Sequence, residues 1–133
     1  MRVEQQLPLV LALTICDDVW FDRNTRKSSV MGIFATVAAR TMPHVVGRLA
    51  VYLCLTECPA KMNVQVRIVD VNESRPAVAQ TQELIESSDP RQTLQGVYRF
   101  DAVSFPEFGE YRVQLLADGE LMLERRLVLL QIG

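Results

Sequence analysis

Hydrophobic and polar residues alternate along most of this chain with the two-residue period of a β-strand. The clearest case is the segment 62–71, in which Val64 and Val66 fall on one face and Gln65 and Arg67 fall on the other. One face of such a strand is buried in a core and the opposite face is wet. No segment shows a sustained helical period of 3.6 residues. The pattern therefore predicts an all-β protein.

Nine segments follow this pattern, and prolines or polar turn residues separate most of them. The predicted strands cover roughly residues 7–17, 28–34, 36–42, 48–56, 62–71, 76–86, 93–103, 110–117 and 121–131. About eight or nine short strands are typical of two packed antiparallel sheets, so a β-sandwich is predicted. No internal repeat or flexible linker interrupts the pattern. We expect residues 1–133 to form a single domain.

Two connections have informative sequences. Asp118-Gly119 lies between the last two strands and supplies the two positive-φ positions of a tight type I′ turn. The polar segment 17–29 separates the first two strands and is expected to be a loop or a protruding hairpin. Within it, Asp22 and Asn24 are suited to begin a turn, because their side chains bond to nearby backbone groups.

The first and last strands carry apolar residues on both faces. In the first strand, alternate residues of the segment 7–15 form one apolar face, and Val10 and Ala12 occupy the other. In the last strand, Val128 and Leu130 lie opposite the predicted core face. A strand that is apolar on both faces is either covered within its own fold or buried against another chain. These four residues are therefore candidates for self-association into a homo-oligomer.

Two large aromatic residues stand in the otherwise polar segment between the first two strands. Trp20 and Phe21 lie between the carboxylates of Asp18 and Asp22. Exposed aromatics in this setting would form a recognition surface for a protein partner or a stacking platform for a sugar. Alternatively, one ring closes the open end of the sandwich and anchors the loop.

Catalytic and metal-binding residues are sparse. His44 is the only histidine and precedes a predicted strand, where a partly exposed loop position is expected. A zinc site built from His44, Cys16, Cys54 and Cys58 is conceivable by residue type. However, Cys54 and Cys58 would lie about 13 Å apart on one extended strand. We therefore expect no enzyme activity, and a catalytic role for His44 as a base is only an alternative.

The first loop offers a second metal hypothesis. Asp17, Asp18, Asp22 and Asn24 carry oxygen ligands of the kind that bind calcium. The spacing is not that of an EF-hand, because the central Gly and the closing Glu are missing. Turn formation explains the same residues equally well. The six glycines are dispersed, so no phosphate-binding loop and no cofactor are predicted.

Charge and composition exclude two classes of partner. The net charge is −2 and basic residues are dispersed among acidic ones, which argues against a nucleic-acid partner. The apolar run from Leu7 to Ile15 is too short to cross a bilayer as a helix. The segment from Met1 to Gln6 lacks the layout of a secretory signal. With three cysteines, an odd number, a reducing cytoplasmic location is expected.

Three blocks of sequence resemble an uncharacterised family of bacterial proteins, a domain of unknown function of about this length. They are CDDVWFDRNTRKSSVMGIF, MPHVVGRLAVYLCLTE and FGEYRVQLLADGELMLERRL. The family pattern favours Gly after Thr in the first loop, where this chain has Arg26. The tripeptide ending in Tyr111 is also similar to a strand entry of immunoglobulin-like sandwiches. The resemblance carries over no activity.

From these observations we expect a non-catalytic β-sandwich that assembles with itself or binds a protein partner. The alternative from another class is a small-ligand or carbohydrate-binding domain that uses the segment 17–29.

Overall fold

Residues 6–133, the part of the chain that the computed structural model describes, form nine strands. The prediction of an all-β protein with nine strands in two sheets is confirmed. The strands are β1 (Leu9–Phe21), β2 (Ser28–Ile33), β3 (Thr36–Ala39), β4 (His44–Thr56), β5 (Lys61–Asp70), β6 (Ala79–Glu86), β7 (Leu94–Phe105), β8 (Gly109–Ala117) and β9 (Glu120–Gln131). The described residues include no helix that is long and apolar enough to span a membrane.

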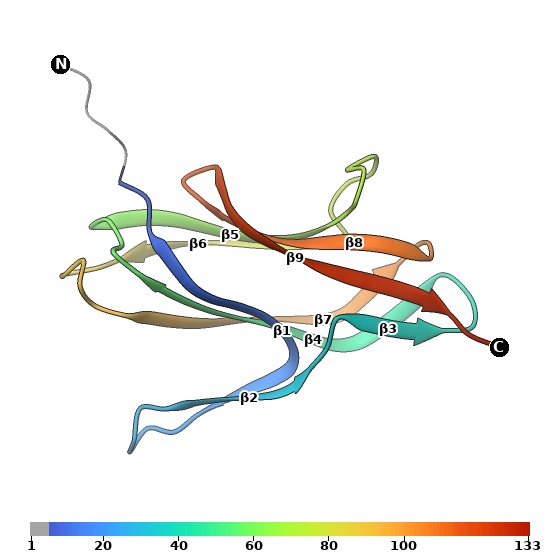
Figure 1. The fold of residues 1–133 in the computed structure, drawn as a ribbon, viewed down its shortest axis with the longest axis horizontal. Coiled ribbons are helices and arrows are strands. Elements are labelled where there is room, and N and C mark those ends of the chain that lie inside the picture. Colours follow the sequence, from blue (N-terminus) through green and yellow to red (C-terminus); the bar gives the residue numbers. More distant parts are fainter. Residues whose placement is uncertain (1–5) are drawn as a thin grey trace.

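The strands form two layers, which Figure 1 shows one above the other. One sheet has the order β2-β1-β4-β7 and is called sheet A; the other has the order β3-β9-β8-β5-β6 and is called sheet B. The pairing is antiparallel except between β3 and β9, which run parallel. The prediction of two purely antiparallel sheets is therefore wrong for this one pair of strands. The chain leaves sheet A where the Phe34 N–H donates to the Ile15 carbonyl (3.1 Å). It joins sheet B at the next residue and keeps its direction, which makes β3 parallel to β9.

The core lies between the two sheets and is built by alternate residues of the central strands. Leu53 and Phe105 from sheet A and Val66 and Leu127 from sheet B are each at most 1% exposed. The ring of Phe105 meets that of Tyr111 edge to face, with centroids 5.0 Å apart. Because these rings belong to β7 and β8, the contact joins the two sheets. The inward face predicted for the segment 62–71 is confirmed.

The predicted tight turn between β8 and β9 is also confirmed. Asp118 and Gly119 have φ values of 48° and 83°, the left-handed conformation at both central positions. The turn is tied to β5, because the Asp118 N–H donates to the Asn63 carbonyl (2.8 Å) and the Asn63 N–H donates to Asp118 Oδ1 (2.9 Å).

A β-bulge in β1 changes which of its residues point outward. The register with β4 shifts between Val10 and Ala12, so Leu11 is an extra residue. Val10 consequently packs against the core, whereas Leu9 and Leu11 are 55% and 53% exposed. The sequence prediction placed Val10 on the outer face and is wrong, because a one-residue insertion inverts the alternation. Ala12 lies partly buried opposite Cys54.

The outer face of sheet B is polar. Glu110 accepts a hydrogen bond from Arg112 on the same strand (2.6 Å) and forms an ion pair with Arg126 on the neighbouring strand β9 (2.8 Å). At the end of β9, Val128 is partly buried and Leu130 is 49% exposed, opposite the buried core residues of that strand. The outer face of sheet A is different, because part of the chain folds over it.

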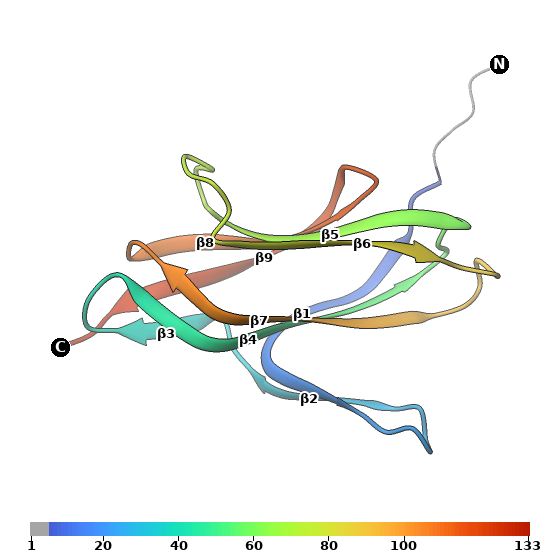
Figure 2. The same cartoon turned by 180° about the vertical axis from the view of Figure 1, so that it is seen from behind.

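The edges of the two sheets meet on the side shown in Figure 2, where β6 and β7 run close together. Tyr98 on β7 donates its hydroxyl to Glu83 Oε2 on β6 at 2.8 Å. Burial, followed by the hydrogen bond to Glu83, raises the pKa of Tyr98 well above its usual range, so the hydroxyl keeps its proton. This side of the molecule is closed by a direct link between the sheets.

Candidate functional site: a folded-back arm and an open edge

The second half of β1 and the whole of β2, residues 16–33, form a hairpin that we call the arm. In Figure 1 the arm leaves sheet A and passes beneath it. Its base is a small apolar cluster, separate from the main core, in which Cys16, Val19 and Ala50 are at most 7% exposed. The partly buried residues packed against this cluster are Val30, Tyr52 and Val97. The arm therefore covers an apolar patch on the outer face of β4 and β7.

Charged residues fasten the arm to the sheet. Arg99 on β7 donates from Nε to Asp18 Oδ1 (2.8 Å) and from Nη2 to the Val19 carbonyl (2.9 Å). Arg48 on β4 adds a longer contact of 3.4 Å to the other oxygen of Asp18. The hydrogen bond from Arg99, with further help from the Val19 N–H, holds the pKa of Asp18 below its usual range. Asp18 is thus a tether for the arm.

This tether predicts a weakening of the arm in acid. The pKa of Asp18 is lower in the folded protein than in the unfolded chain. The contact between Asp18 and Arg99 therefore stabilises the arm fully at pH values above the ordinary carboxyl pKa of about 4. That stabilisation is lost as the pH falls through the lowered value. We expect the methyl NMR signals of Val19 and Val30 to move in acid before those of the main core. In Asp18→Asn this early step should be absent, and its persistence would contradict the role of Asp18.

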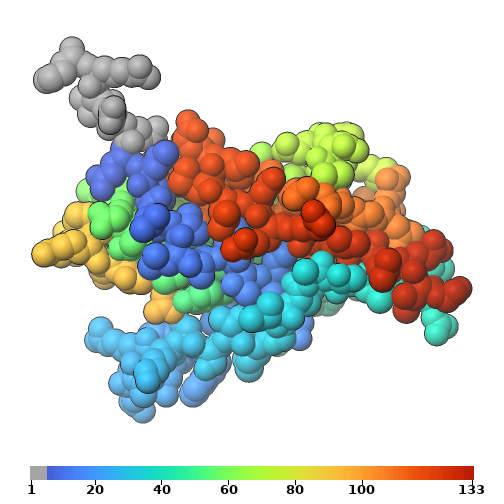
Figure 3. All heavy atoms as spheres, viewed as in Figure 1, coloured from blue at the N-terminus to red at the C-terminus, as the bar shows by residue number. Residues whose placement is uncertain are grey.

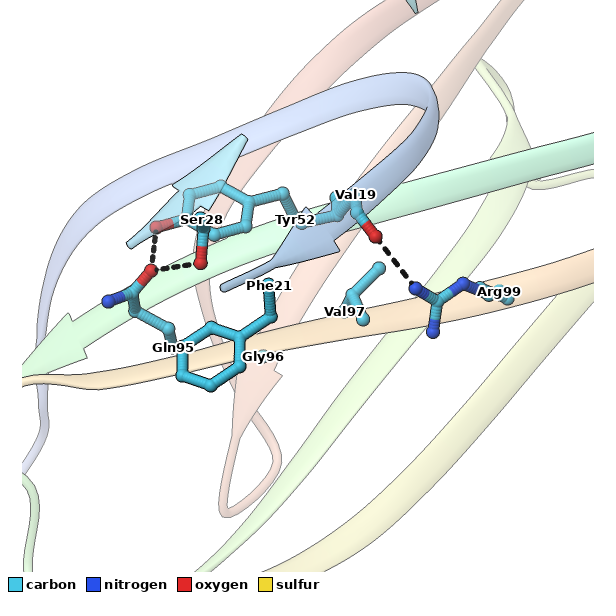
Figure 4. A pocket seen from close by; sticks show the side chains of 8 residues that line it. All are labelled: Val19, Phe21, Ser28, Tyr52, Gln95, Gly96, Val97 and Arg99. Carbon is cyan, nitrogen blue, oxygen red and sulfur yellow. Dashed lines mark hydrogen bonds between the residues drawn. The ribbon is translucent and has the colours of Figure 1, made fainter. Parts of the chain in front are cut away.

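A cleft of about 340 Å³ lies between the arm and the sheet. It is lined by Val19, Phe21, Ser28, Tyr52, Gln95, Gly96, Val97 and Arg99. Figure 4 shows Gln95 at one end of this cleft and Arg99 at the other. Gln95 Oε1 accepts hydrogen bonds from the hydroxyls of Ser28 (2.6 Å) and Tyr52 (2.8 Å). These bonds join β2 to β4 and β7 and fix the side chain of Gln95.

The predicted aromatic pair is exposed rather than plugging the end of the fold. Trp20 is 58% exposed, and Phe21 is 52% exposed while lining the cleft. The two side chains alternate along β1, so only Phe21 is among the residues that line the cleft. Residues 17–21 belong to β1, which is longer than predicted, so the segment 17–29 is a protruding hairpin. Trp20 itself stays a candidate partner contact.

The turn of the arm uses the residues expected to start it. Asp22 Oδ1 accepts a hydrogen bond from the Asn24 N–H (2.8 Å). The Arg26 N–H donates to the Asp22 carbonyl at 2.7 Å. Arg26 has a φ of 60°, the left-handed conformation that Gly adopts without cost. This explains why Gly suits this position in the sequence pattern that the chain resembles.

The residues considered for metal binding and catalysis lie in different environments. Cys16 is in the arm cluster and Cys58 is in the main core, and burial raises the pKa of both thiols. Cys58 is not on the same strand as Cys54, because β4 ends at Thr56. His44 is the first residue of β4. Among residues 6–133, no three His, Cys, Asp or Glu side chains gather to hold a metal ion, and this includes the acidic residues of the segment 17–24.

The first half of β1 forms an open edge on the other side of the molecule. β2 pairs with β1 only from Cys16 onward, and β3 pairs with β9 only from Val128 onward. On their outer side, residues 9–14 therefore pair with no strand among the described residues, although β9 lies beside them. Arg125 of β9 reaches across and donates to the Leu13 carbonyl at 3.0 Å. Figure 3 shows β1 in blue beside β9 in red on this face.

The open edge is apolar and uncharged. Leu7, Leu9 and Leu11 are 39%, 55% and 53% exposed, and no charged residue occurs from Leu7 to Cys16. Exposed edge strands normally carry charges, prolines or bulges that discourage pairing with another chain. β9 has such a protecting charge in Arg125, which points toward β1. β1 has only its bulge and the proline at position 8.

Sequence reasoning missed Tyr52, Gln95 and Arg99, because two strands that are distant in the sequence, β4 and β7, bring them together. One signal was available. In β4 the segment 49–55 is apolar at almost every position, so its outer face also had to be covered. The covering element is the arm.

Comparisons with known proteins give a family but no activity. No curated protein matches the chain. Among solved structures, 89% of the chain superimposes on the alkylpurine DNA glycosylase AlkC of Pseudomonas fluorescens, bound to DNA containing an abasic site analog, with a TM-score of 0.46 and 12% identity. The chain spans 30% of the length of that protein. Residues 11–129 match a family described as being of unknown function, DUF6941, which confirms the resemblance seen in the sequence, and the chain belongs to this family.

Proposed function

We propose that this protein is a non-catalytic binding module that associates with a second copy of itself through the open edge of β1. The observation that carries the proposal is the apolar, uncharged segment 9–14, whose outer side is paired with no strand among the described residues and has only the Leu13 carbonyl bonded, to Arg125 of β9.

The geometry favours an identical partner. Two copies of the segment 9–14 can pair antiparallel about a two-fold axis, so that each supplies the backbone donors and acceptors that the other lacks. Leucines would then lie near leucines, with no like charges opposed across the new pair. Pairing would also remove Leu9 and Leu11 from water, which contributes roughly 25 cal/mol for each Å² of apolar surface buried.

Native mass spectrometry and sedimentation across a concentration series test this proposal. The wild type is expected to form a dimer, and Leu11→Lys is expected to weaken it by about a hundredfold, because two ammonium groups would face each other across the two-fold axis. Leu84→Lys is the matched control, because Leu84 is 64% exposed on β6, away from the open edge. A wild-type monomer at all concentrations, or equal weakening by both variants, would refute the proposal.

We infer that the chain is one domain with an immunoglobulin-like sandwich fold. Tyr111 supports it, because this residue lies near the start of β8 and donates its hydroxyl to the Glu107 carbonyl four residues earlier (2.8 Å), like the tyrosine corner of such domains. The three free thiols of the described residues suit the reducing conditions of the cytoplasm.

Small-ligand binding is a second candidate function, and the cleft beneath the arm favours it. It uses different residues from the open edge, so the two functions can be tested separately.

A further inference from the structure

We propose that the cleft beneath the arm binds a small carboxylic acid with a flat apolar body. The inference is independent of self-association, because the cleft and the open edge share no residue.

Gln95 keeps unused hydrogen-bonding capacity in the cleft. Its Oε1 lies 2.6 Å from Ser28 Oγ and 2.8 Å from the Tyr52 hydroxyl oxygen. Distances this short are typical of O–H···O bonds, so both hydroxyls donate and the amide oxygen is the acceptor. The amide nitrogen of Gln95 is thereby turned away from Ser28 and Tyr52, and it makes no hydrogen bond within residues 6–133. Its two N–H groups are free to donate to a ligand at the end of the cleft farthest from Arg99, as Figure 4 shows.

Arg99 supplies the second free donor. It uses Nε for Asp18 and Nη2 for the Val19 carbonyl, while Nη1 has no partner among the described residues. Arg48 and Arg99 both contact Asp18, so this trio keeps one positive charge. The Gln95 amide oxygen and the Asp18 carboxylate are occupied as acceptors, whereas the free groups of Gln95 and Arg99 are donors. A complementary ligand must therefore carry acceptor oxygens and, best of all, a negative charge.

The remaining walls determine the body of the ligand. Val19 and Val97 are apolar, and the ring of Phe21 lies half exposed in the lining. At Gly96 only the backbone of β7 lines the cleft, because a side chain at this position would point toward Leu53 in the core and away from the arm. A volume of about 340 Å³ is at the lower end of the range for ligand sites. It accommodates a molecule of about ten non-hydrogen atoms, which favours a free small molecule over a folded partner.

Phenylacetate is a suitable probe, and ¹H–¹⁵N NMR titration measures its binding. We expect saturable shifts of the Gln95 side-chain amide signals and of the Val97 amide, with a Kd on the order of 1 mM. Phenylacetamide has the same size and ring but no charge, and it should bind about tenfold more weakly. Saturable shifts with phenylacetate and weaker ones with phenylacetamide would support the site.

Gln95→Glu is the matched variant. The carboxylate keeps acceptor oxygens for Ser28 and Tyr52 but loses both free donors and repels an anion. Phenylacetate should bind at least about tenfold more weakly to this variant, while the amide signals of Val19 and Val30 show that the arm is still in place. No saturable shift at Gln95 in the wild type, or equal binding of phenylacetate and phenylacetamide, would overturn the proposal.

Discussion

Replacing Phe105 with Ala is expected to lower the free energy of unfolding by about 3–5 kcal/mol. The Phe105 side chain is completely buried, and its ring contacts Tyr111 edge to face across the two sheets. The substitution removes buried apolar surface, leaves a cavity and deprives Tyr111 of its aromatic partner. Urea denaturation, monitored by circular dichroism, measures the change. The variant should have a lower midpoint than the wild type, with the same m-value for both proteins.

Phe21→Ala is the matched control for this prediction. It removes the same atoms from the same residue type, but Phe21 is 52% exposed in the arm. Its cost should stay within about 1 kcal/mol, because little surface is returned to water. If both variants lost similar stability, the position of Phe105 between the sheets would not be what stabilises the fold.

The second prediction concerns Gly32, where the arm ends and the chain crosses toward sheet B. Gly32 has a φ of 66°, and an added Cβ would lie 2.2 Å from Asp17 Oδ2. Gly32→Ala must therefore adopt a left-handed conformation that Ala disfavours and must also displace the Asp17 side chain. We expect a loss of about 1–3 kcal/mol in unfolding free energy, measured by the same denaturation experiment.

Gly47→Ala separates this local strain from the general effect of replacing Gly with Ala. Gly47 lies in β4 outside the left-handed region, and an added Cβ there would meet no atom within 4 Å. Its effect should be neutral or slightly stabilising, because Ala reduces the conformational freedom of the unfolded chain. A loss at Gly47 equal to that at Gly32 would show that the conformation of Gly32 is not the cause.

The proposals for the open edge and for the cleft depend on how β1 divides its length between two neighbours. Residues 9–14 have a strand partner on one side only, whereas residues 16–21 pair with β2 and fold over sheet A. The first half of β1 therefore offers an edge for another copy, and the second half builds a cleft for a small molecule. Variants such as Leu11→Lys and Gln95→Glu affect one proposed function each.

The strand pattern by itself determined much of this protein. Alternation of apolar and polar residues located nine strands and identified Val64 and Val66 as core, because a strand buried on one face must alternate. The turn at Asp118-Gly119 was also readable, because few residue pairs adopt two positive φ angles. These features are local, so a few neighbouring residues suffice to specify them.

Only the tertiary structure decided which outer surfaces are covered. The bulge at Leu11 reverses the exposure of Val10 and Leu9, although nothing in the continuous apolar run 9–13 marks a bulge. The arm buries Cys16, Val19 and Ala50 on the outer face of sheet A, and it brings Phe21 next to Gln95 and Arg99. Contacts between distant strands depend on the order of strands in the sheets and on where the chain bends. The two-residue alternation of the sequence carries no information about either. For this reason the sequence determined the strands and the core, and the fold alone determined the cleft and the open edge.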